Sequence, residues 1–186
     1  MNTVHLKRLI IISITILPHF YQKKKHKGRN FMNHNFFMNE ALIEAQKAYE
    51  KNEVPIGAII VQNNKIIARA HNLREISQMT ASHAEMLAIH TANEQTGFWR
   101  LDEATLYTTL EPCMMCAGTI VQSRIQTVVY GAKDEKAGCA GTIFNLLQEE
   151  QFNHQCDVIG GVMESECREL LSRFFQDLRA KKRNKQ

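Results

Sequence analysis

At 186 residues the chain is long enough for one domain with a substantial core and too short for two ordinary domains. Its 44% apolar and 23% charged residues are those of a globular protein, and its five cysteines, an odd number, argue against a disulfide framework. The net charge of +4 is uneven, because residues 1–31 contribute +7 and the remainder −3, which excludes a uniformly basic nucleic-acid-binding surface.

The first 31 residues contain an apolar run, Leu9 to Leu17, followed by the basic run 23–27. The apolar run is too short for a membrane span, which takes about 20 residues, and no Ala-x-Ala-like cleavage site follows it. We therefore expect residues 1–31 to be a non-native or disordered extension, with Met32 or Met38 as the natural start, and we expect no membrane partner. A membrane-attached variant is the alternative, and mass spectrometry of the native N-terminus distinguishes the two.

The next segment predicts one helix and a β-hairpin. Helical spacing of apolar residues extends from Glu40 to Lys51. Two runs composed mainly of apolar residues, 58–61 and 65–68, are separated by Asn63-Asn64, a dipeptide typical of turns.

Further along, the pattern alternates between helix and strand. We expect a helix from His83 to Asn93 with Ser82 as its N-cap, and a strand from Ala104 to Thr109. A second helix is expected from Cys113 to Ser123, with Pro112 suited to its first turn because proline lacks the N–H that a helix start leaves unused.

A short β run from Thr127 to Gly131 and a final helix from Glu164 to Lys181 complete the order. Alternation of this kind predicts an α/β protein, namely a three-layer α/β/α sandwich around a mixed five-stranded sheet. We expect residues 32–183 to form this single domain.

Two fragments carry the chemistry: His83-Ala84-Glu85 and Pro112-Cys113-Met114-Met115-Cys116. Together they offer three zinc-type ligands, His83, Cys113 and Cys116, and leave one tetrahedral position open, as in catalytic zinc sites. Glu85 is then available to move protons. The combination H-x-E…P-C-x-x-C is a known signature of zinc-dependent base deaminases.

Each fragment alone is ambiguous. A lone Cys-x-x-Cys also occurs in redox pairs and in structural zinc knuckles. A structural zinc site would need a regularly spaced fourth ligand, whereas Cys139, Cys156 and Cys167 each stand alone. Because both fragments are expected at helix N-termini, the exposed N–H groups there should lower the thiolate pKa.

Beyond these fragments, residues 36–183 resemble the bacterial tRNA-specific adenosine deaminases of the TadA type, within the cytidine deaminase-like superfamily. The resemblance is carried by several blocks: Glu53-Val54-Pro55-Ile56-Gly57-Ala58, Ala70-His71-Asn72, Leu106 to Gly118, Ser123-Arg124-Ile125, Val129 to Asp134 and Phe152-Asn153-His154.

The resemblance implies hydrolytic deamination of the wobble adenosine, position 34 of a tRNA, to inosine. One Zn²⁺ per subunit, held by His83, Cys113 and Cys116, would activate water. Glu85 would take the proton of that water, deliver it to N1 of adenine and assist the departing amine.

The resemblance also implies substrate contacts. Asn72 would touch the flipped nucleotide, and Asp134 the RNA sugar, whose 2′-OH distinguishes RNA from DNA. Phe174 and Phe175 occupy the family's paired aromatic positions, where at least one is expected in the core. The remaining expected substrate-binding residues are Val54, Pro55, Ala84 and Leu110 around the base, and Lys133, Lys136 and Arg179 facing phosphates.

The expected partner is a tRNA anticodon stem-loop, of an arginine tRNA in particular, and not DNA; the expected state is a homodimer in the cytoplasm. Two other functions remain open. One is a deaminase of a free base or nucleoside such as guanine or cytosine, which would not need the basic residues 179–185. The other is a catalytically silent zinc-binding subunit, which the presence of Glu85 disfavours.

Overall fold

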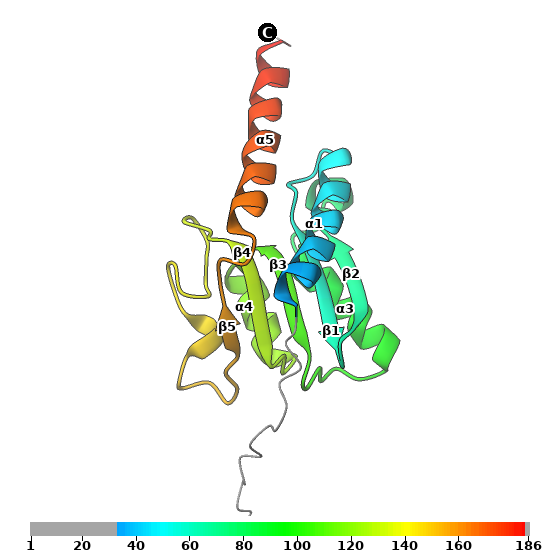
Figure 1. Cartoon of the computed structure of the whole chain (residues 1–186), viewed down its shortest axis with the longest axis vertical. Coiled ribbons are helices and arrows are strands. Elements are labelled where there is room, and N and C mark those ends of the chain that lie inside the picture. The colour runs from blue at the N-terminus through cyan, green and yellow to red at the C-terminus, as the bar shows by residue number, and fades with distance from the viewer. Residues whose placement is uncertain (1–32, 185–186) are drawn as a thin grey trace, which may run out of the picture. The chain divides into compact units, whose positions relative to one another are not determined.

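Five strands form one sheet in the order β2-β1-β3-β4-β5 (Figure 1). The structure is a computed structural model that describes residues 33–184, so the expectations for residues 1–31 and for Met32 lie outside the described residues. The hairpin of β1 (Gly57–Gln62) and β2 (Lys65–His71) is antiparallel. β1 also pairs antiparallel with β3 (Thr105–Leu110), whereas β4 (Thr127–Ala132) and β5 (Asp157–Ile159) continue the sheet in parallel. The predicted mixed five-stranded sheet is confirmed.

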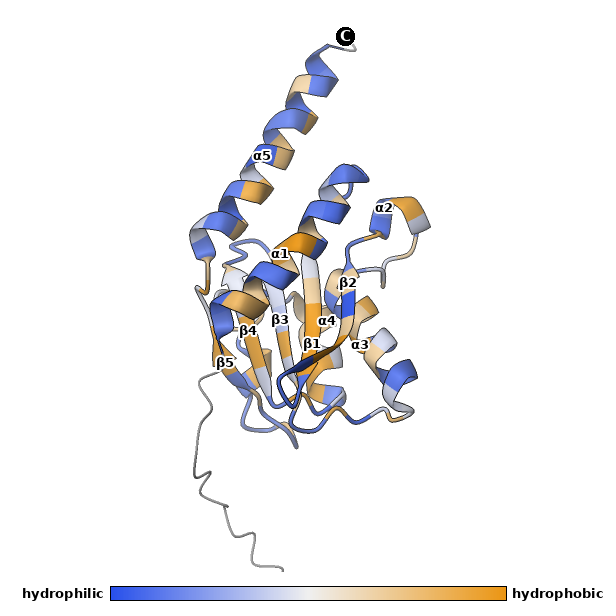
Figure 2. Ribbon diagram, turned by 45° about the vertical axis from the view of Figure 1, so that its right-hand side comes forward, coloured by the Kyte–Doolittle hydropathy of each residue, from blue (hydrophilic) through white to orange (hydrophobic). Residues whose placement is uncertain are grey.

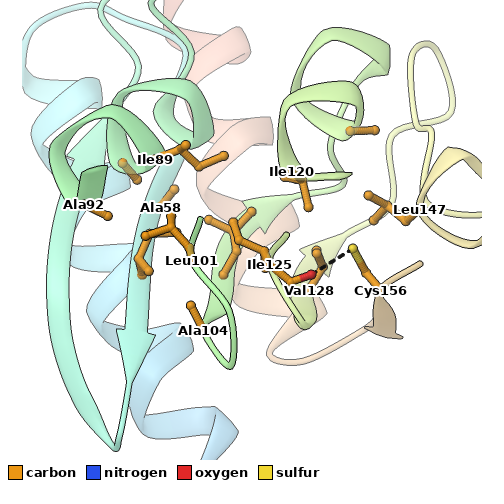
Figure 3. Close-up of a cluster of buried hydrophobic side chains, with 14 of the residues drawn as sticks. Ala58, Ile89, Ala92, Leu101, Ala104, Ile120, Ile125, Val128, Leu147 and Cys156 are labelled. Atoms are coloured by element: carbon orange, nitrogen blue, oxygen red, sulfur yellow. Dashed lines mark hydrogen bonds between the residues drawn. The ribbon is translucent and has the colours of Figure 1, made fainter. Parts of the chain in front are cut away.

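Helices cover both faces of the sheet because apolar side chains point alternately to its two sides. One face packs against α3 (Ala84–Thr96) and α4 (Met114–Gln122), in a core that includes Ala58, Ile89, Ile120 and Val128 (Figure 3). The neighbouring strand residues, such as Ile59 and Val129, point to the other face.

The second face is covered by α1 (His34–Glu50) and α5 (Glu164–Arg183). Phe37 and Met38 of α1 and Cys167 of α5 are buried there with Tyr107 of β3. In Figure 2 the last turns of α5 are mainly hydrophilic, in keeping with the basic residues of its last turn. The three layers are therefore those that the sequence predicts. None of the described helices is long and apolar enough to span a membrane.

The starts of α1, α3 and α4 differ from the sequence-based expectations. α1 begins at His34, because the Asn33 side chain caps it by accepting a hydrogen bond of 3.1 Å from the N–H of Phe36. The prediction of Ser82 as an N-cap is wrong, since His83 occupies that position and the Ser82 Oγ instead lies 2.8 Å from the Ser77 Oγ, which donates to it. Two short helices, α2 (Arg74–Ser77) and η1 (Leu146–Gln148), were not predicted.

Pro112 also lies outside the helix that it was expected to start. α4 begins at Met114 with Cys113 as its N-cap. Pro112 therefore precedes the cap, and its carbonyl accepts a hydrogen bond of 2.8 Å from the N–H of Cys139. This bond ties the segment that delivers Cys113 to the loop after β4.

Four connections meet at one edge of the sheet. The register pairs Gly57 at the start of β1 with His71 at the end of β2, and Leu110 at the end of β3 with Ala132 at the end of β4. The residues just outside these positions consequently emerge side by side. Ligands of open α/β sheets bind at such an edge, beyond the carboxyl ends of parallel strands.

Gly57 allows α1 to lie close to β1. A Cβ added at Gly57 would lie 2.1 Å from the carbonyl oxygen of Ala41 and 2.4 Å from the N of Ala45. These are backbone atoms that cannot rotate away, so we expect Gly57→Ala to lower the free energy of unfolding by about 3 kcal/mol, the upper end of the usual cost of overpacking. Denaturant unfolding measures the change.

Gly118, in the middle of α4, provides the matched control. A Cβ added there would meet no heavy atom within 4 Å, and alanine favours helices over glycine by about 1 kcal/mol. Gly118→Ala should thus be at least as stable as the unaltered protein. Equal stability of the two alanine variants would contradict the close packing of α1 on β1.

Candidate metal and substrate-binding site

Three side chains converge at the starts of α3 and α4. The Nδ1 of His83 lies 3.7 Å from the Sγ of Cys113 and 3.5 Å from the Sγ of Cys116, and the two sulfurs are 3.7 Å apart. A tetrahedral zinc ion with ordinary Zn–S and Zn–N bond lengths would place its ligand atoms about 3.6–3.8 Å from one another. The three residues therefore fit zinc, as predicted, and three ligands leave one position open for a reacting molecule.

The pKa values of Cys113 and Cys116 are shifted in opposite directions. The hydrogen bond between the sulfurs of Cys113 and Cys116 lowers the pKa of Cys113 to about 3, against the opposing effect of burial, and the hydrogen bond with His83 lowers it further. The same contact raises the pKa of Cys116, as does its burial. The pKa of His83 is raised, chiefly by the hydrogen bond with Cys113. Cys113 is thus held as a thiolate, the form that binds metals.

Glu85 lies in the first turn of α3, two residues after His83, and only 4% of it is exposed. Within the described residues, the cluster of possible metal ligands contains His83, Cys113 and Cys116 but not Glu85. Burial raises the pKa of Glu85 to about 7, and the negative charge of Cys113 adds to this effect, while the backbone hydrogen bond opposes it. A carboxyl group with a pKa near neutrality can both accept and release a proton during a reaction.

A cavity of about 470 Å³ opens at the edge of the sheet described above. Its wall includes the predicted ligand His83 and, from α5, Arg168, Leu171 and Phe175. Six of the predicted substrate-binding residues line it: Val54, Asn72, Leu110, Lys133, Asp134 and Lys136.

Three predicted residues lie outside this lining. Pro55 is buried between the lining residues Val54 and Ile56, and Ala84, which follows the lining residue His83, is 0% exposed. Arg179 lies further along α5, in a separate surface hollow with Lys182 and Arg183. Its assignment to phosphate binding remains a prediction.

The two phenylalanines of α5 divide their roles. Phe174 is buried and its ring packs edge-on against Tyr49 of α1, with ring centroids 5.7 Å apart. Phe175 is 40% exposed and lines the cavity. At least one of the pair is therefore in the core, as expected, and the other is placed where a base could stack on it.

Two buried carboxylates lie beside the cavity, Glu111 and Glu53, and the sequence alone assigned neither of them a role. Glu111 accepts hydrogen bonds from the backbone N–H groups of Asp134 at 3.1 Å, Ala140 at 3.0 Å and Thr142 at 3.0 Å. Burial alone would raise its pKa, but the hydrogen bond that the Thr142 hydroxyl donates, together with these backbone bonds, outweighs it, and the pKa of Glu111 is lowered. Glu111 thereby fixes the loop that carries Asp134. The second carboxylate, Glu53, holds Asn72.

A signal for both residues exists in the sequence. Glu53 lies two residues before a proline, in Glu53-Val54-Pro55, and Glu111 lies directly before one, in Leu110-Glu111-Pro112. Each acid also adjoins a mainly apolar segment. A charged residue in such a position is rarely buried unless it is paired or hydrogen-bonded.

The chain is similar to known proteins. A family of MafB19-like deaminases matches residues 32–179. The tRNA-specific adenosine deaminase of Bacillus subtilis (strain 168) is 60% identical over 147 residues, which cover 79% of this chain and 91% of that protein. The chain belongs to the tRNA-specific adenosine deaminase family. The predicted family and enzyme class are confirmed.

Two further tRNA deaminases and a guanine deaminase are also similar to this chain. The tRNA-specific adenosine deaminase of Streptococcus pyogenes serotype M18 (strain MGAS8232) is 44% identical over 149 residues, covering 80% of this chain and 94% of that one. A solved structure from a study of A-to-I editing by tRNA:A34 deaminases is 41% identical, with a TM-score of 0.70, and covers 73% of this chain and 98% of that one. The guanine deaminase of Bacillus subtilis is also similar, at 37% identity and a TM-score of 0.54, over 59% of this chain and 71% of that one.

Proposed function

We propose that this chain hydrolyses the exocyclic amine of the wobble adenosine, position 34 of a tRNA, to give inosine and ammonia. The observation that carries the proposal is one cavity lined by six family substrate positions and by His83, a member of the His83-Cys113-Cys116 cluster. Its support from relatives is the 60% identity to a tRNA-specific adenosine deaminase. We assign this activity to residues 32–183.

Bound by His83, Cys113 and Cys116, Zn²⁺ would supply the Lewis acidity that makes water reactive near neutral pH. The protein's own contribution is proton transfer and positioning. Glu85 takes up a proton as water adds to C6 of adenine and passes it to N1. Glu85 then takes the remaining proton from the new C6 hydroxyl and gives it to N6, so the C6–N6 bond breaks and the amine leaves as ammonia.

The cavity suits a base that has left its stack. Val54 and Leu110 offer apolar walls, Asn72 and Asp134 offer polar groups, and Phe175 offers a ring. Lys133 and Lys136 are exposed at the rim, where they face the phosphates of the flanking nucleotides. An anticodon loop meets these requirements because its unpaired bases can be splayed out at modest cost.

The finer assignments belong to the same proposal. Arginine tRNA is the substrate, RNA is bound in preference to DNA through the ribose contact of Asp134, and the chain acts as a homodimer in the cytoplasm. The free cysteines Cys113 and Cys116 support the assignment to the cytoplasm, because a reducing compartment keeps them available as thiolates to hold a metal.

The decisive comparison is between an arginine-tRNA anticodon stem-loop and free bases. We expect inosine to form in the stem-loop, with no ammonia released from free guanine or cytosine. A stem-loop with guanosine at position 34 is the matched control and should give no product. Ammonia from free guanine without inosine in the stem-loop would favour the alternative function, deamination of free guanine. The similarity to the Bacillus subtilis guanine deaminase is the observation that favours this alternative.

A further inference from the structure

Glu53 is a fully buried acid next to the cavity. It is 0% exposed, and its two oxygens each have one partner: Oε2 accepts from the Nδ2 of Asn72 at 3.1 Å, and Oε1 from the backbone N–H of Ile76 at 2.6 Å. A buried carboxylate is costly to maintain unless its position is useful or its bonds are strong. The cavity lining includes Asn72 and Val54 but not Glu53 itself.

The contact determines which way the side-chain amide of Asn72 is turned. Glu53 is the acceptor in this contact, so the Asn72 atom that faces it is the NH₂ nitrogen, Nδ2. Within residues 33–184, every fully buried side-chain nitrogen or oxygen has a hydrogen-bond partner. The Oδ1 of Asn72, to which no described residue donates, is therefore at the accessible surface, and Asn72 reaches that surface at the cavity.

We infer that Glu53 is a positioning residue for the substrate: through its hydrogen bond it holds the Asn72 amide in one of its two orientations at the cavity wall. The inference rests on the proposed function, because it assigns the amide of Asn72 to the substrate adenosine. Glu53 touches neither the substrate nor the metal ligands; its effect passes through Asn72. If the Asn72 amide were turned over, its NH₂ group instead of its oxygen would face the nucleotide.

Glu53→Gln tests this with almost no change of shape. Glutamine keeps one acceptor oxygen but brings an NH₂ group, so a donor must now face a donor at either Asn72 or Ile76. The backbone N–H of Ile76 cannot turn, whereas the Asn72 amide can. We expect kcat/KM for the arginine-tRNA stem-loop to fall by about 10-fold or more, mainly through a higher KM, with zinc content unchanged.

A double-mutant cycle separates positioning from a purely structural role. In an Asn72→Ala background, Glu53→Gln should change kcat/KM by less than about 2-fold, since the group it acts through is gone. Glu44→Gln is the matched control: Glu44 is also a buried acid, 3% exposed, and pairs with Lys47 and His71 away from the cavity lining. That control should retain the kcat/KM of the unaltered protein.

The outcomes distinguish the inference from the proposed function. An unaltered protein that forms no inosine in the stem-loop would overturn the proposed function and, with it, the inference. An active protein in which Glu53→Gln is harmless, or equally harmful with and without Asn72, would overturn the inference alone. Should Glu53→Gln fail to fold, kcat/KM is measured instead for the variant Glu53→Gln/Asn72→Asp, in which the hydrogen bond is restored in reverse. A value no higher than that of Asn72→Ala would then overturn the inference.

Discussion

Glu85→Gln is expected to retain one zinc ion per subunit and to lose inosine formation by a factor of about 10²–10⁴, the usual contribution of a general acid–base group. Glutamine has nearly the shape of glutamate but cannot accept a proton from water or deliver one to N1. Glu85 is buried and is not one of the three candidate metal ligands, so the metal should remain. Zinc is measured by elemental analysis, and inosine by nucleoside analysis of the digested stem-loop.

The control for this variant is Glu94→Gln. Glu94 lies on the same helix α3 but is exposed, and its contact with His90 is at the surface. Such a pair contributes little, so Glu94→Gln should retain full activity. Near-normal turnover of Glu85→Gln would show that another group moves the protons, and the assignment of Glu85 would be withdrawn.

Cys116→Ala should abolish both zinc binding and activity. Cys116 is 0% exposed and contributes one of three converging donor atoms, so two donors, from His83 and Cys113, would remain. Two ligands bind zinc far more weakly than three, and deamination should fall below detection. Metal content after dialysis and inosine yield are measured on the same sample.

Cys139→Ala is the matched control for the loss of a buried sulfur. Cys139 is 1% exposed, and its Sγ donates to the carbonyl oxygen of Ala137, outside the ligand cluster. This variant should keep its zinc and its activity, at a cost in stability of about 1–2 kcal/mol for the small cavity. Zinc retained by Cys116→Ala, or lost by Cys139→Ala, would show that the ligand set is wrong.

The fold was predictable where the pattern was strong. Strands such as β1 are continuous apolar runs bounded by glycine or asparagine, and the hairpin turn at Asn63-Asn64 requires positive φ angles, which both residues adopt (52° and 60°). β5 was not located by its residues, because three residues, of which two are exposed, carry no period. The prediction of the N-cap of α3 was also wrong, because the local pattern does not fix the exact residue at which a helix begins. Ser82 has the chemistry of a cap, but the helix begins one residue later, and a one-residue difference is beyond what propensity can decide.

The site was predictable in its chemistry but not in its supports. His83, Cys113 and Cys116 were identified from their residue types and spacing, because zinc binds imidazole and thiolate donors. The partners of Glu53 and Glu111 are contacts between residues 19 to 31 positions apart, and no local pattern reports them. Arg179 illustrates the opposite limit: its charge suggested a substrate contact, yet only the course of α5 shows that it lies beyond the cavity lining.

Position-resolved editing of a full-length arginine tRNA tests the central claim most directly. After incubation with the zinc-loaded protein, the tRNA is reverse-transcribed and sequenced, and released ammonia is measured in parallel. The proposed function predicts an A-to-G change at position 34 alone, with one ammonia released for each inosine formed. An unchanged adenosine at position 34, or conversion spread over other adenosines of the same tRNA, would contradict it.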